Sequence, residues 1–243
     1  MQLDRRFASI ILCLLTLAIL AMPAAAQRND NENTDIMKRL EALEAEQRLL
    51  KNEILVLQDR LNAIAPAEDP DRVFDIPIGQ SPVQGQPNAP LTLVVFGDYQ
   101  SAYSNRAQAV VDSLLDAYPG QLKVVYKHMP LTDRHPQASA AALSAIAAQL
   151  QDKFWDMHQR LIRYSRRLDA DIYPLLATEI GLDIVRFQND RNSLLALERL
   201  GEDEKLAARL GVDAVPTFFL NGRRMSTWRY DYLREQIDRL LGR

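Results

Sequence analysis

The sequence predicts an α/β protein that carries a helical insertion and is preceded by a coiled-coil helix. An apolar run over residues 91–96 and a second over 122–127 enclose an amphipathic stretch over 105–118. A strand, a helix and a strand at this spacing form a right-handed β-α-β unit with parallel strands. A helical pattern from 135 to about 210 separates this unit from a further strand, and heptads precede it at 36–64.

Residues 1–26 have the pattern of a cleavable secretory signal. Two arginines precede an apolar run over 7–22, and alanines occupy positions 24–26. A basic start, a short apolar core and a small-residue site are typical of exported precursors. We therefore expect a mature chain that begins at Gln27 and is periplasmic or extracellular. The alternative is an uncleaved membrane anchor, for which the apolar run is rather short.

The composition excludes several classes of function. The 243 residues carry a formal net charge of −3, which gives no basic footprint for nucleic acid and no strong attraction to an anionic membrane. Cys13 is the only cysteine and lies within the predicted signal. The mature chain would then contain no thiol and no disulfide, so its stability must come from core burial. We expect no metal and no cofactor.

Residues 34–64 predict a coiled-coil oligomerisation helix. Apolar residues recur at alternating steps of four and three over four heptads, which favours a coiled-coil seam over the wider stripe of a surface helix. The seam, with Gln47 in its one polar position, contains Ile36, Leu40, Leu43, Leu50, Ile54, Leu57, Leu61 and Ile64. We expect a homo-oligomer, trimer or dimer, through residues 36–64. The alternative is a helix that folds back on its own globular domain.

Charges beside the seam favour parallel association. Leu40 at heptad position a places Arg39 and Glu46 at g positions. In a parallel, in-register assembly they face Glu44 and Lys51 of the neighbouring chain, and both pairs are attractive. Each exposed pair contributes only about 0–1 kcal/mol, so these charges select orientation more than they add stability.

Residues 65–90 predict a linker with a short edge strand. Two prolines and several acidic residues over 66–71 end the preceding helix. Asp75–Gly79 is the expected edge strand, because a proline is tolerated at a sheet edge. The globular domain then covers 91–243.

Glycines and turn residues delimit the remaining helices and strands of the domain. The insertion, at about 135–210, opens with an alanine-rich helix over 138–150 and closes at Gly211. A strand over 215–220 is bounded by the turn Asn221-Gly222, a strand follows antiparallel to it, and an amphipathic helix over 230–241 ends the chain.

A polar turn after the first strand carries the resemblance to a known family. It lies where a strand ends and a helix begins, which is where α/β sheets usually build their sites. With the later Val215-Pro216-Thr217, this turn resembles the active-site segment of the DsbA-like thiol:disulfide oxidoreductases, a branch of the thioredoxin fold. That family has Cys-x-x-Cys where this chain has Ser101-Ala102-Tyr103-Ser104. The resemblance covers about 73–243 and implies a thioredoxin-like fold with a helical insertion, in which Pro216 is a cis proline facing the turn.

Serine cannot replace cysteine in thiol exchange. A helix amino terminus stabilises an anion by about 0.3–1 kcal/mol and at most ~2 kcal/mol. Since about 1.36 kcal/mol corresponds to one pKa unit, the pKa of a hydroxyl would fall by only about one or two and the group would stay neutral. Serine also forms no disulfide. The sequence therefore excludes the redox activity of the family, and we expect no catalytic residue.

Ser101 has a structural interpretation that is simpler than catalysis. A serine before a helix is a favoured N-cap, since its oxygen accepts from backbone N–H groups. An acyl-transfer nucleophile would need a base within hydrogen-bond reach, and the candidates are His128, His135 and His158. We expect His135 to cap the insertion and His158 to pack beside Phe154, so we do not favour a serine hydrolase.

The preferred hypothesis is an exported, non-catalytic protein that binds polypeptide, as a chaperone-like or scaffold protein. The groove between the turn and Val215-Pro216 is where the resembled family holds extended substrate chains. One alternative is an enzyme similar to kappa-class glutathione transferases, which use a serine near this turn to hold the glutathione thiolate; here that residue would be Ser101. Another is an engineered Cys-to-Ser form of a disulfide oxidoreductase or isomerase. The sequence identifies no client.

Overall fold

The computed structural model describes residues 36–54 and 72–243, and the chain divides into two units, Met1–Glu68 and Asp69–Arg243. In the first unit, residues 36–54 form an α-helix whose side chains are all exposed. The helix predicted by the heptads is thus present over this range, and its pairing with another copy stays a prediction. The secretory signal predicted for 1–26 and the last heptads of the seam lie outside the described residues.

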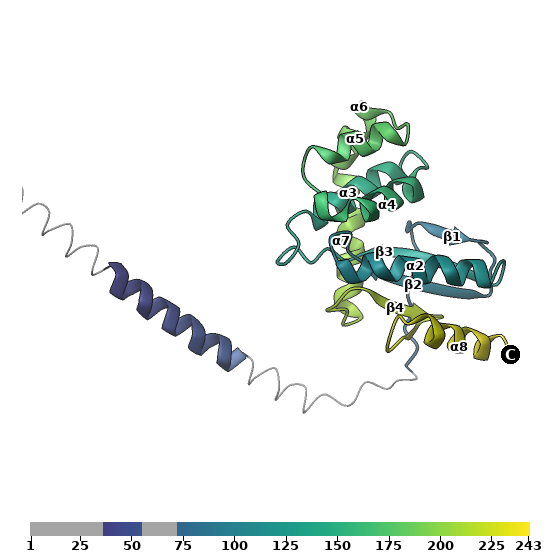
Figure 1. Ribbon diagram of the computed structural model, residues 1–243, viewed down its shortest axis with the longest axis horizontal. Coiled ribbons are helices and arrows are strands. Elements are labelled where there is room, and N and C mark those ends of the chain that lie inside the picture. The colour runs from purple at the N-terminus through teal and green to yellow at the C-terminus, as the bar shows by residue number, and fades with distance from the viewer. Residues whose placement is uncertain (1–35, 55–71) are drawn as a thin grey trace, which may run out of the picture. The chain divides into compact units, whose positions relative to one another are not determined.

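A parallel β-α-β unit forms the centre of the second unit, as the sequence predicts (Figure 1). Strand β2 (Leu91–Gly97) pairs with β3 (Leu122–His128) in parallel, from Leu91 opposite Leu122 to Gly97 opposite His128. Helix α2 (Ala102–Ala117) connects them. Both strands are buried on their two faces, which explains their continuous apolar runs.

Antiparallel strands complete a five-stranded sheet with the order β1-β3-β2-β4-β5. Strand β4 (Thr217–Leu220) pairs with β2, and β5 (Arg223–Arg224) pairs with β4. The turn between them has positive φ at Asn221 and Gly222, and a side chain at Gly222 would meet the Phe74 carbonyl oxygen.

The edge strand predicted at Asp75–Gly79 is wrong. That segment is irregular, and β1 (Val83–Gly85) takes the edge by pairing antiparallel with β3. Pro77 has no N–H to donate to a neighbouring strand. Ile76 and Ile78 pack instead against a core cluster beneath the sheet.

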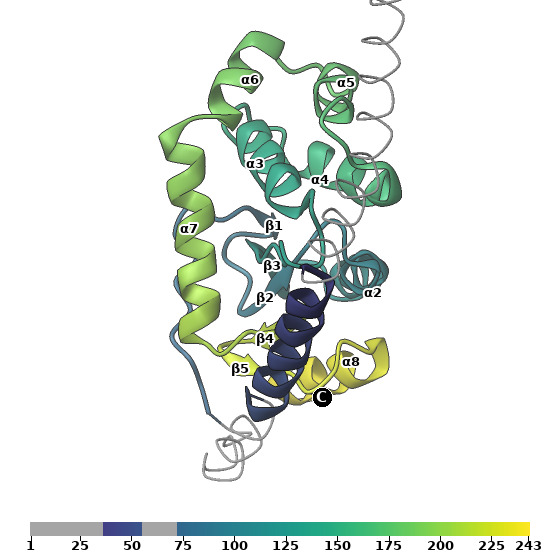
Figure 2. The ribbon, with the colours of Figure 1, turned by 90° about the vertical axis from the view of Figure 1, so that its left-hand side faces the viewer.

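Helices cover both faces of the sheet (Figure 2). Helix α2 and the last helix, α8 (Tyr230–Leu240), lie on one face, where they share a core with alternate residues of β2 such as Leu93. Helix α7 (Leu194–Arg209) lies on the other face, where Leu206 packs with Phe96 and Phe219.

The insertion is helical, as predicted for about 135–210. Five α-helices and one short 3₁₀ turn lie between β3 and β4. The elements not yet given bounds are α3 (Ala138–Gln149), α4 (Phe154–Arg163), η1 (Ser165–Arg167), α5 (Ile172–Glu179) and α6 (Ile184–Arg191). Alanines make α3 small enough to be almost wholly buried between its neighbours. The α/β class with a helical insertion is therefore confirmed.

Candidate functional site

The turn after β2 and the segment before β4 lie at the same edge of the sheet. Phe96, near the end of β2, is opposite Thr217, the first residue of β4. The peptide bond between Val215 and Pro216 is cis, as the resemblance implies. Because β2 leaves the sheet where β4 enters it, the turn and the cis proline come from neighbouring strands.

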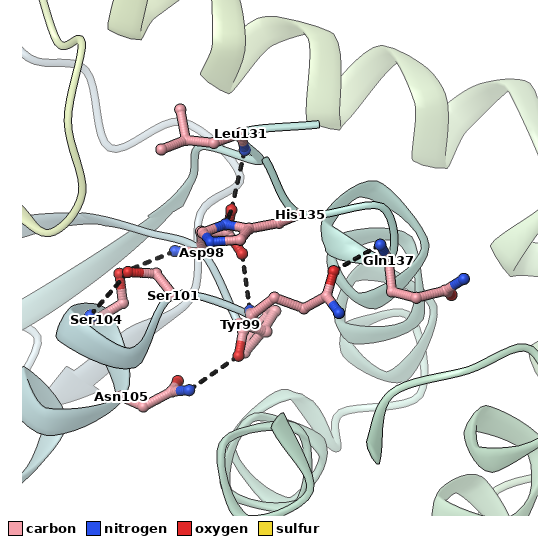
Figure 3. Close-up of polar contacts among 9 residues, drawn as sticks. Asp98, Tyr99, Ser101, Ser104, Asn105, Leu131, His135 and Gln137 are labelled. Carbon is pink, nitrogen blue, oxygen red and sulfur yellow. Dashed lines mark hydrogen bonds and ion pairs between the residues drawn. The ribbon is translucent and has the colours of Figure 1, made fainter. Parts of the chain in front are cut away.

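The two serines of this turn stabilise its backbone (Figure 3). Ser101 is the N-cap of α2, and its Oγ accepts from the Ser104 N–H at 3.3 Å. The Ser104 Oγ accepts in turn from the Asp98 N–H, also at 3.3 Å. The predicted capping role of Ser101 is confirmed. Ser101 is only 4% exposed.

Asp98 organises the turn, a role that the sequence interpretation missed. Its carboxylate is fully buried; it accepts from the Gln100 N–H at 2.8 Å and from the Leu131 N–H at 2.9 Å. The same carboxylate lies 2.7 Å from His135 Nδ1. The bond to Gln100 is an Asx-turn, whose signal is an aspartate two residues before the bonded N–H. The other two donors come from the segment after β3, so His135 joins two loops.

Two amides tie the turn to the surrounding helices. The side-chain oxygen of Gln100 accepts from the Gln137 N–H at 2.6 Å, just before α3. The side-chain nitrogen of Asn105, in α2, donates to the Tyr99 carbonyl at 3.0 Å. Each residue of the turn from Asp98 to Ser101 thus has its own anchor (Figure 3).

His158 is buried behind the turn in a chain of hydrogen bonds. Its Nδ1 is 3.0 Å from the Tyr99 hydroxyl, and its Nε2 is 3.0 Å from the side-chain oxygen of Gln108. Since that amide oxygen can only accept, Nε2 carries the proton and Nδ1 accepts from the tyrosine. Burial, with a smaller effect of His128, lowers the pKa of His158 to about 3. The predicted packing beside Phe154 is confirmed.

His128, at the end of β3, is buried without hydrogen-bond partners. Neither ring nitrogen meets a donor or acceptor, and the ring packs against Tyr126, Tyr99 and Phe154. Burial, with a smaller effect of Lys127, lowers the pKa of His128 to about 3. Over the described range 72–243, no histidine bonds to Ser101 or Ser104, so the base that a serine hydrolase needs is not in place.

We name the first residues of α2 and the segment around the cis proline the turn face, which consists of Ala102, Tyr103, Val215, Pro216 and Thr217. The Tyr103 side chain is 60% exposed and the Arg106 guanidinium lies 4.7 Å from its ring centre. Ala102 is exposed, whereas Val215 is 9% exposed. Within the described ranges, no group of His, Cys, Asp or Glu side chains is placed to hold a metal ion.

Comparison with known proteins identifies the family. Residues 92–238, more than half of the chain, match the DSBA-like thioredoxin domain. The chain belongs to this family. The match runs from β2 into α8, so it includes both the serine turn and the cis proline. Within the matched range the chain has Ser101-Ala102-Tyr103-Ser104 at the turn and a cis peptide bond before Pro216.

Solved structures of similar fold include redox proteins. Oxidised BdbD from Bacillus subtilis superposes with a TM-score of 0.63 at 20% identity, over 70% of this chain and 98% of that one. A thioredoxin-like oxidoreductase from Silicibacter pomeroyi gives 0.60 at 26% identity, over 73% of this chain and 99% of that one.

A curated relative is much longer than the shared region. The Na(+)/H(+) antiporter NhaA 1 of Mycolicibacterium gilvum is 36% identical over 145 residues, which are 58% of this chain and 23% of that protein. This chain spans less than a quarter of such relatives. Among the described residues, no helix has the length and apolar character to cross a membrane.

Proposed function

We propose that this DSBA-like protein is redox-inactive and that its turn face binds extended polypeptide. The observation that supports this proposal is that the serine hydroxyls of the turn bond within it, while a neighbouring aromatic side chain is exposed. The hydroxyls that replace the family's thiols are used to hold the turn, while Tyr103 beside them is 60% exposed.

Dithiol exchange needs two thiols, because one sulfur attacks and the second resolves the mixed disulfide. This chain has one cysteine, Cys13, among its 243 residues. With Ser101 and Ser104 at the positions of the family's cysteines, the turn lacks the two sulfur atoms that dithiol exchange requires. The glutathione alternative would require Ser101 to reach a bound thiolate, but that residue is 4% exposed and caps α2, so we do not favour it.

Polypeptide binding suits the surface that remains. An exposed tyrosine offers a large, rigid contact area with a polar end, and the Arg106 guanidinium over the Tyr103 ring adds a donor for peptide carbonyls. Pro216 has no backbone N–H, so its backbone can offer a bound peptide only a carbonyl oxygen. Binding proteins hold extended segments through exposed backbone and pockets for alternate side chains.

The same proposal includes export of the protein and its assembly as a homo-oligomer. In the helix over 36–54, the seam side chains Leu40 and Leu43 are 49% and 62% exposed. A row of exposed leucines at heptad spacing is what a parallel coiled coil buries. The partner is a second or third copy of this chain, because the charged pairs predicted beside the seam are self-complementary. Several copies would present several turn faces to one client, which raises avidity.

The binding experiment uses a client that cannot undergo disulfide exchange. Fluorescently labelled, reduced and carboxymethylated α-lactalbumin is titrated with the protein and followed by anisotropy. Tyr103→Ala should weaken binding by about tenfold, since central aromatic contacts are worth on the order of 1–2 kcal/mol. Leu175→Ala is the matched control, because Leu175 is 63% exposed and belongs to α5 of the insertion, not to the turn face. Equal affinities of the two variants would contradict the proposal.

A further inference from the structure

A cavity of about 280 Å³ lies outside the turn face. It opens to solvent and is lined by residues of α7, the last turn of α3, the end of β3 and residues 77–82. Figure 2 shows α7 running alongside α3 and one face of the sheet. The turn face contributes none of the lining residues, so this is a separate feature of the molecule.

The floor of the cavity is a buried ion pair whose atoms are satisfied. Lys127 Nζ lies 3.1 Å from Asp203 Oδ1 and donates to the Ile78 carbonyl at 3.3 Å. The second oxygen of Asp203 accepts from the His128 N–H at 2.9 Å. Both side chains are less than one-tenth exposed. The pair is neutral as a unit and needs no further ligand.

The wall formed by α7 carries an excess of positive charge. Arg199, Lys205 and Arg209 line it together with one further acid, Glu202. Among the described residues, no carboxylate pairs with any of the three basic side chains. The Nε atom of Arg199 is also shielded from solvent and has no hydrogen-bond partner. An unpaired guanidinium N–H out of contact with water is unfavourable, so a rearrangement of this side chain that gives it an anionic partner in the cavity is favoured.

Part of the lining is apolar, including Leu206 on α7 itself. Pro77, Pro82, Ile146 and Leu206 contribute to the lining, so a purely ionic ligand would leave this part of the cavity unfilled. At about 30 Å³ for each water-sized volume, the space accommodates on the order of ten non-hydrogen atoms. Small-molecule sites combine an apolar lining with a few polar groups that fix orientation, and this cavity has that composition.

We propose that the cavity binds a small organic carboxylate whose apolar body contains about seven to nine carbons. The carboxylate pairs with the Arg199 guanidinium, which offers planar, paired donors for such a group, and Lys205 adds charge. The apolar body lies against Ile146 and Leu206. The Lys127–Asp203 pair forms a rigid floor and keeps its own hydrogen bonds.

Calorimetric titration of the full chain tests the proposal with three probes. Sodium octanoate has both the charge and the apolar body, 1-octanol has the body alone, and inorganic phosphate has charge alone. We expect saturable octanoate binding with a Kd of about 1 mM or tighter, and binding at least about tenfold weaker for each of the other two probes. Arg199→Gln should weaken octanoate binding by about tenfold, because a hydrogen bond to a charged group is lost, and Lys205→Gln should weaken it less.

Arg163→Gln is the matched control, since Arg163 is an exposed arginine at the end of α4 that does not line the cavity. Its affinity for octanoate should equal that of the unaltered protein. Thermal unfolding of each variant separates loss of binding from loss of fold. The absence of saturable octanoate binding overturns the proposal, as does equal binding of octanol or an unchanged affinity in a folded Arg199→Gln protein. Phosphate that binds as tightly as octanoate overturns the apolar half of the assignment.

Discussion

The ends of β2 and β3 lie side by side, and they treat buried polar groups in opposite ways. Gly97 is opposite His128 in the parallel ladder. Directly after β2, the buried Asp98 carboxylate meets three donors. At the end of β3, the equally buried His128 meets none. The difference indicates that hydrogen bonds hold the turn after β2 as a rigid unit. The His128 ring at the end of β3 instead packs as an apolar side chain would.

The largest effect is expected from restoring sulfur to the turn. Ser101→Cys with Ser104→Cys changes one atom in each side chain and places a thiol at the amino terminus of α2, which lowers its pKa below that of free cysteine. The variant should form a disulfide and reduce insulin, and the natural protein should show no activity. Thiolate absorbance titration and an insulin assay measure both properties. Activity in the natural protein would contradict the redox-inactive assignment, and thiols that never pair would show that the turn is not preorganised.

The buried histidines should make stability fall in acid. The pKa values of His128 and His158 are about 3 in the folded protein and near 6.5 in an unfolded chain. The unfolded state therefore binds more protons below pH 6.5, so this stability is complete above pH 6.5 and is lost as the pH falls toward 3. Each histidine contributes a slope of up to about 1.4 kcal/mol per pH unit.

Urea unfolding between pH 7 and 5 measures this slope above the range in which most carboxylates titrate. His158→Gln should remove about half of it, since one of the two depressed groups is gone. A free energy of unfolding that stays level over this pH range would show that the two histidines are not buried in neutral form.

Removing the Asp98 carboxylate should cost about 3 kcal/mol. Asp98→Ala leaves the N–H groups of Gln100 and Leu131 without their acceptor, and each unsatisfied buried donor costs about 1–3 kcal/mol. Asp98→Asn keeps one acceptor oxygen and should cost less. Asp116→Ala, which changes an exposed aspartate near the end of α2, is the control. Urea unfolding at pH 7 compares them, and an Asp98→Ala protein as stable as the control would remove Asp98 from its organising role.

The sequence predicted those parts of the fold that depend on local pattern. Strands β2 and β3 and the helices of the insertion are marked by burial and periodicity along the chain, and the capping role of Ser101 is set by its immediate neighbours. The prediction at Asp75–Gly79 was wrong because tolerance of a proline at a sheet edge does not by itself produce a strand, and the two isoleucines of this irregular segment pack beneath the sheet instead.

The network around Asp98 could not be predicted because its partners are distant in sequence. Two of its three donors lie 33 and 37 residues away, and the partner of Lys127 lies on α7. Only the packing of the insertion against the sheet brings these groups together. The Asx-turn to Gln100 was the one local signal.

The smallest effect, and the sharpest contrast, is expected from two matched histidine variants. His128→Leu removes a ring with no hydrogen-bond partner, and replacing an unsatisfied buried polar group by an apolar one is neutral or stabilising by about 1 kcal/mol. His158→Leu removes a ring that bonds to both Tyr99 and Gln108, so it should destabilise by about 1–3 kcal/mol. The two variants carry the same chemical change within one aromatic cluster. Urea unfolding at pH 7.5, where both histidines are neutral in either state, therefore isolates hydrogen bonding from charge, and equal losses in the two proteins would mean that His128 has a partner after all.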